Sequence, residues 1–466
     1  MLFSSIPFLF YFLPIVILLY FAVPNKFRNA VLLLSSLFFY GWGEPRFLFF
    51  MIISIIQGYV FGLLIEKHKG TKRSKVFLTA SVVLSLGLLG YCKYADFFIE
   101  NFNVLTGLSV PLLGIALPIG ISFYTFQILS YAVDVYRGDV PAQRNFITLA
   151  AYIAMFPQLI AGPIVRYSDV AKQLENRTHS FEKASEGIRR FVIGFSKKIL
   201  LANTLGELVA TFKASDDKSV LFYWLYALAY MLHVYFDFSG YSDMAIGLGK
   251  IFGFDFMENF NYPYISGSIT EFWRRWHMSL GSWFRDYLYI PMGGNRVSTP
   301  RWLFNILVVW MATGFWHGAA WNFVLWGLMF AVLLTIEKLF LMKGLKKLKV
   351  LNHIYVLFFV CFSFVLFDSL SISEAAQSMG AMLGAGKIPL MSAETLYYLK
   401  SYSVLLIAGI VGATPLCPAL VKKVQKTNWG AVIVNIAEPL VLLTLLVVCT
   451  AYLIDGSFNP FLYFRF

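Results

Sequence analysis

Charged residues are scarce in this chain of 466 residues. Asp, Glu, Lys and Arg make up 14% of it, whereas hydrophobic residues make up 59%. An ordinary soluble domain carries about 25% charged residues, so the composition excludes that class of protein. The chain is therefore predicted to be an integral membrane protein, and its long apolar segments indicate helices, which satisfy their own backbone hydrogen bonds in lipid.

Cysteine is also rare, and common nucleotide and nucleophile motifs are missing. The four cysteines are widely separated, without a CxxC pair or a Cys/His ligand spacing, so we expect neither a disulfide framework nor a metal site. There is no G-x-S-x-G serine motif and no Walker loop. Gly247, Gly249 and Gly253 come within one residue of the dinucleotide-binding pattern, but they lie in an apolar segment, where we interpret them as helix packing.

Positive charge exceeds negative charge, with 38 basic and 25 acidic residues and a net charge of +13. No basic soluble segment is present, so we expect no nucleic-acid partner. Basic loops at residues 67–75, 343–349 and 422–426 instead predict cytoplasmic loops that contact anionic membrane lipids. The basic residues Lys26 and Arg28 follow the first apolar segment, which places the N-terminus outside in a bacterial-type cell membrane.

About a dozen apolar segments approach the roughly 20 residues that a membrane-spanning helix needs. No long Pro, Ser or Gly linker separates them, so we expect a single membrane domain over residues 1–466. The predicted spans are residues 8–23, 30–42, 47–65, 76–91, 111–135, 146–165, 191–208, 221–248, 302–336, 354–370, 402–420 and 431–453.

The clearest functional signal is a cluster of ionisable residues between Glu271 and His317. Five arginines lie there among tryptophans, and His277 and His317 bound most of the region. Ionisable side chains at membrane depth are costly and usually mark a substrate or proton path, so the cluster predicts an intramembrane active site. Residues 255–301 are expected to be interfacial or re-entrant and buried against protein. The arginines are Arg274, Arg275, Arg285, Arg296 and Arg301.

Local patterns place this chemistry on helices. Ser268 and Glu271 match a capping box that begins a helix, on which Glu271 and Arg275, and likewise Trp273 and His277, are four residues apart. The 35 residues of segment 302–336 are too many for one span, and a break near Gly314 and Gly318 would leave His317 at the end of a half-helix. Glycine on either side also lets a ligand approach the backbone closely.

Histidine suits one reaction class in particular. Its unperturbed pKa lies near neutrality, so an imidazole takes a proton from a hydroxyl and passes it to a leaving group. Transfer of an acyl group from a thioester to an alcohol needs this proton removal and the positioning of the two substrates. A histidine of this cluster is therefore a candidate for the general base of an acyl transfer.

The motifs around these histidines resemble those of the membrane-bound O-acyltransferase (MBOAT) family. The runs FDFSGYSDMAIG at 236–247, ENFN at 258–261 and FWRRWHMSL at 272–280 carry the resemblance. RDYLYIPMGGNR at 285–296 and WHGAAW at 316–321 narrow it to the AlgI-like alginate and polysaccharide O-acetyltransferase branch. The ending Asn459-Pro460-Phe461 also fits this branch.

The resemblance implies a ring of about 11–12 transmembrane helices, with re-entrant or interfacial helices around a central channel and a catalytic core at about residues 230–330. The family's essential histidine falls on His317, and its second characteristic histidine falls on His277, so the resemblance implies His317 as the base and His277 as a nearby helper. The implied reaction takes acetyl from cytoplasmic acetyl-CoA, a substrate rather than a permanently bound cofactor, to a hydroxyl of an extracytoplasmic polysaccharide. An extracytoplasmic acetyltransferase partner protein is implied as well.

Two interpretations remain open for the remaining candidate residues. In one interpretation, Arg274, Arg275 and Arg285 bind donor phosphates or a partner's carboxylates. In the other, they form an internal network with Glu271 and Asp286 or contact lipid headgroups. Four polar residues at an expected span terminus either line an acceptor path or have a capping and hydrogen-bonding role, namely Asp237, Ser239, Tyr241 and Asp243. Asp286, Trp276, Trp316 and Asn322 complete the predicted substrate- and donor-binding residues.

Two rival functions fit much of the same sequence. A DltB-like enzyme would transfer D-alanine from a carrier protein to teichoic acid, although the YIPMGGNR run at 289–296 favours the AlgI-like side. An anion transporter would instead spread its polar groups through inverted repeats, and no such repeat is visible in the sequence.

Overall fold

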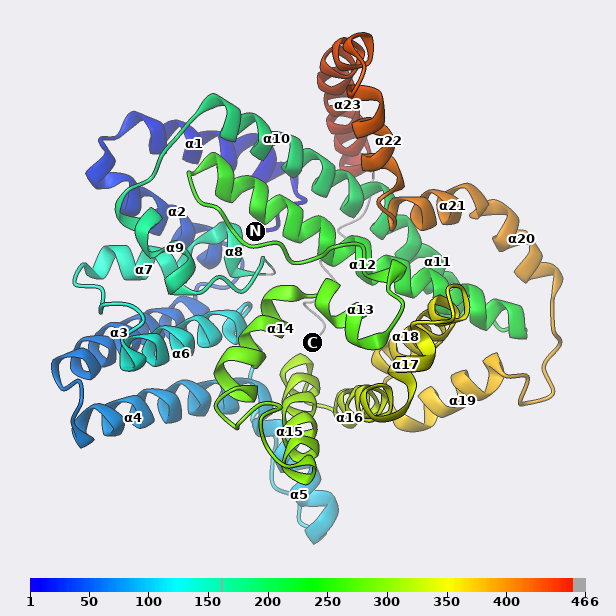
Figure 1. Ribbon diagram of the computed structural model, residues 1–466, viewed down its shortest axis with the longest axis horizontal. Coiled ribbons are helices and arrows are strands. Elements are labelled where there is room, and N and C mark those ends of the chain that lie inside the picture. Colours follow the sequence, from blue (N-terminus) through cyan, green and yellow to red (C-terminus); the bar gives the residue numbers. More distant parts are fainter. Residues whose placement is uncertain (161, 456–466) are drawn as a thin grey trace. The chain divides into compact units, whose positions relative to one another are not determined.

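A computed structural model describes residues 1–160 and 162–455 (Figure 1). The regular structure of these residues is helical and includes no β-strand, which confirms the predicted all-α class. The Asn459-Pro460-Phe461 motif lies outside the described residues. The chain divides into two compact units, Met1–Phe191 with Ser242–Met257 and Val192–Tyr241 with Glu258–Phe466. The single domain over residues 1–466 stays a prediction.

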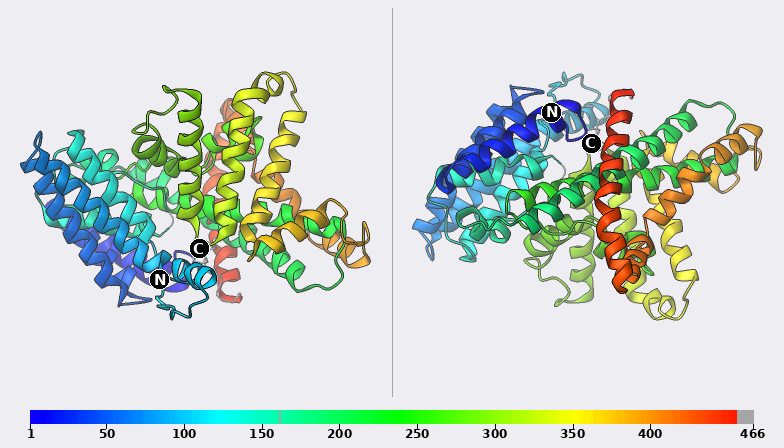
Figure 2. Two further views of the ribbon diagram at one scale, coloured as in Figure 1. Left: turned by 90° about the horizontal axis from the view of Figure 1, so that it is seen from below. Right: turned by 90° about the horizontal axis from the view of Figure 1, so that it is seen from above.

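The first unit contains α1 to α9, most of α10 and the end of α12. Helices α3, α4 and α6 pack side by side (Figure 2), and α6 is buried along almost its whole length. The bounds are α1 Leu13–Ala22, α2 Arg28–Gly41, α3 Phe47–Lys67, α4 Lys72–Leu89, α5 Ala95–Thr106, α6 Ile121–Arg137, α7 Phe146–Ala154, α8 Phe156–Leu159, α9 Tyr167–Glu175, α10 Phe181–Ser196 and α12 Val220–Ile251.

The second unit has its apolar core around the first two thirds of α12. Aromatic and aliphatic side chains of α11, α13, α16 and α18 pack on that part of α12. The bounds are α11 Thr204–Ala214, α13 Ile269–Arg275, α14 Met278–Phe284, α15 Thr299–His317, α16 Trp321–Ile336, α17 Met342–Leu345, α18 Leu351–Asp368, α19 Ile372–Met382, α20 Ala393–Ser401, α21 Ser403–Gly412, α22 Leu416–Gln425 and α23 Asn428–Asp455.

Fewer long helices are present than the dozen predicted spans. Among the described residues, six helices are long and apolar enough to cross a membrane, or seven if α20 and α21, which meet at 56°, form one broken span. The six are Phe47–Lys67, Lys72–Thr106, Val220–Ile251, Trp321–Leu345, Leu351–Asp368 and Asn428–Asp455. The chain is thus a multi-pass membrane protein, and its arrangement as a ring stays a prediction.

Proline and glycine explain why the helices in two of the predicted spans are shorter than predicted. The predicted span 111–135 is helical only from Ile121, because Pro118 precedes it and Gly120 adopts a left-handed φ of +76°. The predicted span 146–165 contains two short helices, α7 and α8. They separate at Met155, and Pro157 occupies the first turn of α8, where a proline is tolerated because it starts a helix rather than continuing one.

The glycines at the end of α12 serve helix packing, as the sequence predicts. In the first unit, a methyl group on Gly247 would lie 2.5 Å from the carbonyl oxygen of Gly187 on α10. A methyl group on Gly249 would lie 2.7 Å from the ring of Phe256. These contacts leave no room for a dinucleotide at the glycines.

Candidate active site

His317 is the last residue of α15, at the tip of a helical hairpin. Residues 318–320 reverse the chain into α16, so the predicted break in segment 302–336 is confirmed. Methyl groups on Gly314 and Gly327 would lie 2.2 Å from the carbonyl oxygens of Phe323 and Trp310, respectively. The later residue of α15, Gly314, meets the earlier residue of α16, Phe323, and the earlier residue of α15, Trp310, meets the later residue of α16, Gly327. The two helices are therefore antiparallel neighbours, and their glycines allow the backbones to come into contact.

The glycines beside His317 do not leave space for a ligand, which corrects the expectation from the sequence. Phe323 of α16 fills both positions, with its carbonyl oxygen against Gly314 and its ring against Gly318. A methyl group on Gly318 would lie 2.1 Å from that ring. The glycines therefore fix the hairpin that carries His317.

Substitution of Gly314 by alanine is expected to destabilise this hairpin. The added methyl group meets backbone atoms, which cannot rotate away, so overpacking should cost about 1–3 kcal/mol and lower the melting temperature of the detergent-solubilised protein. Gly87→Ala in α4 is the matched control, because its methyl group would meet nothing within 4 Å. Equal melting temperatures for Gly314→Ala and the wild type would contradict the packing described.

Aromatic rings enclose His317. The imidazole packs edge to face against Trp326 of α16, with ring centroids 5.2 Å apart, and against Phe367 of α18, at 5.5 Å. The residue is only 7% exposed. Asn322 donates hydrogen bonds from Nδ2 to the carbonyl oxygens of Phe367 and Ser369, at 3.4 and 2.9 Å. Asn322 thus holds the end of α18 where Phe367 reaches the imidazole.

His277 lies between two short helices rather than on one. The predicted cap at Ser268 is confirmed, since Ser268 Oγ accepts from the N–H of Glu271 at 3.0 Å. The Glu271 side chain accepts from the N–H of Gly267 at 2.9 Å rather than from that of Ser268, so the reciprocal bond of a capping box is replaced, and α13 ends at Arg275. His277 adopts a left-handed φ of +44° and precedes α14. The predicted helical face shared by Trp273 and His277 is therefore wrong, because the left-handed residue turns the chain away from the axis of α13.

Asn259 determines which nitrogen of His277 carries the proton. The Asn259 side-chain oxygen accepts from the backbone N–H of Ser279 at 3.2 Å and from its hydroxyl at 2.8 Å. Since this oxygen only accepts, His277 Nδ1, 3.1 Å away, must be the donor. His277 Nε2 is then the unprotonated nitrogen, and it is buried without a hydrogen-bond partner among the described residues.

Burial keeps His277 neutral. The residue is 1% exposed, and desolvation lowers the pKa of its imidazole to about 3. Phe238 packs edge to face on the ring, with centroids 4.6 Å apart. A neutral imidazole with a free acceptor nitrogen is suited to accept a hydrogen bond from a substrate hydroxyl.

Trp316 connects the two histidines. Its ring centroid is 5.9 Å from that of His277 and 5.0 Å from that of His317. The structure thus brings together two residues that are 40 positions apart in the sequence (317 minus 277) and encloses both in aromatic side chains. Trp276 contributes to the same packing, against Phe260 at 5.1 Å and Phe364 at 5.4 Å.

Two of the three candidate arginines form internal ion pairs, which was one of the two alternatives predicted from the sequence. Arg275 binds Glu271 at 2.9 Å, and Arg285 makes a two-pronged contact with Asp286, at 2.6 and 3.0 Å. Arg274 is exposed. A role of these residues in binding the donor stays a prediction.

The polar residues of α12 do not lie at a span terminus, contrary to the sequence interpretation. They occupy the interior of helix Val220–Ile251, so helix capping is wrong for them. In the second unit, Asp237 forms an ion pair with Lys198, and both side chains are 1% exposed. In the first unit, Asp243 accepts hydrogen bonds from Arg190 at 3.0 and 2.9 Å. Ser239 and Tyr241 are buried.

Sequence reasoning did not single out Asn259, Trp326 and Phe367. Asn259 belongs to the ENFN run at 258–261, and its place in this motif was the signal that could have identified it. The rings of Trp326 and Phe367 gave no such signal, because they occur in apolar helices in which aromatic residues are common. The described residues include no group of three or more His, Cys, Asp or Glu side chains that could hold a metal ion.

Comparison with known proteins gives the class of this membrane protein. Residues 102–372, which include both histidines, match the membrane-bound O-acyltransferase family, and the chain belongs to that family. It is therefore an acyltransferase.

Individual relatives are similar over most or all of the chain. A probable alginate O-acetylase AlgI of Azotobacter vinelandii is 40% identical over the full length of both chains. A protein of the same description from Pseudomonas aeruginosa is 44% identical over 83% of this chain and 75% of its own. A peptidoglycan O-acetyltransferase of Helicobacter pylori is 32% identical over 84% and 81%, respectively.

Proposed function

We propose that the protein transfers an acetyl group from cytoplasmic acetyl-CoA to a hydroxyl of an extracytoplasmic polysaccharide, with His317 as the general base. The observation that carries the proposal is the pair of buried histidines on either side of Trp316. The names of the relatives support an acetyl group and a polysaccharide acceptor. The cell membrane of a bacterium is the proposed location.

The reaction needs one proton transfer and one bond exchange. His317 takes the proton of the acceptor hydroxyl while the oxygen attacks the thioester carbonyl. The carbon–sulfur bond then breaks, and the thiolate of coenzyme A leaves and takes up the proton. The products are the acetyl ester and free coenzyme A. An extracytoplasmic acetyltransferase partner protein would receive the acetyl group or deliver the polysaccharide acceptor.

Helix ends divide the roles of the two histidines. His317 is the last residue of α15, which has 19 residues, and the partial negative charge at a helix C-terminus stabilises an imidazolium. His277 instead precedes the N-terminus of α14, where the partial positive charge disfavours a cation. His317 is therefore better suited to hold the proton, and His277 Nε2 is better suited to orient the hydroxyl.

The donor can be tested with membranes that contain the protein, its partner and the polysaccharide. Acetyl-labelled acetyl-CoA is expected to label the polysaccharide, and unlabelled D-alanyl carrier protein is expected not to compete. Competition by the carrier protein would favour D-alanyl transfer instead. Uptake of label into vesicles without any ester formation would favour an anion transporter.

A further inference from the structure

Two arginines of the first unit lie against one tyrosine ring. The guanidinium carbons of Arg28 and Arg177 are 5.2 and 5.6 Å from the ring centroid of Tyr20. Tyr20 is fully buried, whereas both arginines are partly exposed. Two positive charges are thus held next to each other at the boundary of an apolar core.

In the part of the chain that the structure describes, no carboxylate pairs with these two charges. Within the described residues, no Asp or Glu oxygen lies within 4.0 Å of either guanidinium. Their partners are neutral, since Arg177 Nη2 donates to Asn29 Oδ1 at 2.6 Å and Arg28 Nη1 lies 3.1 Å from His179 Nδ1. Arg28 Nε and Arg177 Nη1 have no hydrogen-bond partner within the described residues.

His179 is neutral in this arrangement. The Tyr20 hydroxyl donates to the carbonyl oxygen of Phe252 at 2.9 Å, so it accepts from His179 Nε2, 3.0 Å away. Nδ1 is then the lone-pair nitrogen, which accepts from Arg28. Burial, followed by the charges of Arg28 and Arg177, lowers the pKa of His179. The imidazole therefore neither adds to nor offsets the two arginine charges.

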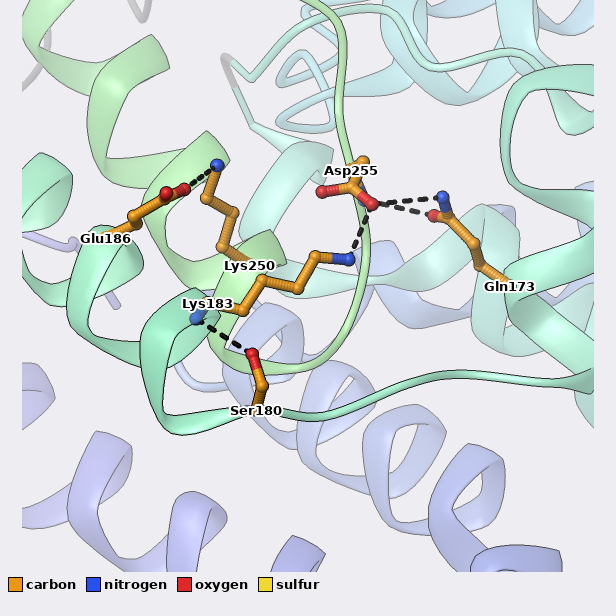
Figure 3. Close-up of polar contacts among 6 residues, drawn as sticks. All are labelled: Gln173, Ser180, Lys183, Glu186, Lys250 and Asp255. Carbon is orange, nitrogen blue, oxygen red and sulfur yellow. Dashed lines mark hydrogen bonds and ion pairs between the residues drawn. The ribbon is translucent and has the colours of Figure 1, made fainter.

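Nearby lysines of the same unit differ from these arginines. Lys183 pairs with Asp255 at 2.6 Å, and Lys250 pairs with Glu186 (Figure 3). Each lysine thus has its own carboxylate, which makes the lysine cluster electrically balanced. Within the described residues, Arg28 and Arg177 lack such a carboxylate, and like charges held together without a counter-charge favour an anion from outside the chain.

We propose that Arg28 and Arg177 form a binding site for a phosphoryl group. Guanidinium groups bind phosphate with two parallel hydrogen bonds. Each of the two guanidinium groups has a nitrogen, Arg28 Nε or Arg177 Nη1, without a hydrogen-bond partner within the described residues. Arg28 begins α2, just after the first apolar helix, whose predicted orientation places it at the cytoplasmic face. The phosphate there belongs either to an anionic lipid headgroup or to coenzyme A, and the second source rests on the proposed function.

Binding of two soluble probes to the purified full-length protein tests the site without requiring turnover. The probes are adenosine 3′,5′-bisphosphate, which represents the phosphates of coenzyme A, and short-chain phosphatidylglycerol, both titrated calorimetrically in detergent. The double variant Arg28→Gln/Arg177→Gln is expected to bind at least one probe about tenfold more weakly or worse. The matched control Lys183→Gln/Lys250→Gln removes the same total charge and should bind like the wild type.

The outcomes separate the sources and the alternatives. Loss confined to the bisphosphate assigns coenzyme A, and loss confined to the lipid assigns the headgroup. Arg28→Lys/Arg177→Lys keeps the charges and guards against a folding defect, and weakened binding by this variant supports a bidentate contact. Unchanged binding of both probes by the glutamine variant overturns the site, as does an equal loss in the lysine control. Neither result depends on whether acetyl transfer is observed.

Discussion

Replacement of His317 by alanine is expected to reduce acetyl transfer by about 10²- to 10⁴-fold, the usual contribution of a positioned general base. The imidazole sits at the negative end of α15 within an aromatic enclosure, and no other described imidazole occupies that helix end. The loss should appear in kcat, because His317 acts on the proton of the acceptor. The KM for acetyl-CoA should change little.

The matched control for this variant is His353→Ala. His353 is a partly buried histidine of the same unit, and its Nδ1 lies 3.0 Å from the carbonyl oxygen of Ser266. Removal of its side chain should leave transfer close to the wild-type rate. Melting temperatures of both variants in detergent report whether either has lost its fold. Transfer by a folded His317→Ala protein at a rate close to that of the wild type would exclude His317 as the base.

Substitution of Asn259 by leucine is expected to impair transfer through His277. Leucine removes the oxygen that accepts from His277 Nδ1 and from Ser279, so buried donors lose their partner at a cost of about 1–3 kcal/mol. If this loss raises the free energy of the transition state by the same amount, the rate drops by about 5- to 150-fold. The measurement is kcat for labelled acetyl transfer, with His277→Ala as the reference for complete loss of the imidazole.

Asn259→Asp distinguishes positioning from general damage. Aspartate keeps an accepting oxygen at the same place, so it should recover much of the activity that leucine loses. A similar loss for Asp and Leu, with unchanged melting temperatures, would contradict a role of the Asn259 oxygen in fixing the proton on His277 Nδ1.

Local sequence signals predicted those parts of the site that depend on nearby residues. The cap at Ser268, the ion pair of Glu271 with Arg275, and the break after His317 all follow from residues within a few positions of each other. The packing of Gly247 was predicted from its place in an apolar segment, although the sequence did not indicate its contact with Gly187 of α10. Helix caps and i,i+4 pairs are local interactions, and they survive in any tertiary context that keeps the helix.

The rest of the site depends on contacts that a single sequence does not display. His277 takes a left-handed conformation without being glycine or asparagine, and its ring is held by Asn259, 18 residues earlier. Asp237 appeared to mark a helix end because it is charged, but its pairing with Lys198 allows it to lie inside α12. A buried charge is tolerated once it is paired, and the pairing partner is 39 residues away.

The pH dependence of acetyl transfer tests most directly whether the proton goes to His317. A protonated base cannot accept a proton, so the rate of the wild type should fall on the acid side of its profile. Burial lowers the pKa of His277 to about 3, so its imidazole stays neutral over the pH range of the measurement and should not contribute to that fall. The measurement is kcat/KM for labelled acetyl transfer across pH in the wild type and in His277→Asn. With His317 as the base, the same acid limb is expected in both proteins, with a lower plateau in the variant. Disappearance of the acid limb in His277→Asn would contradict this role of His317, because the titrating base would then be His277.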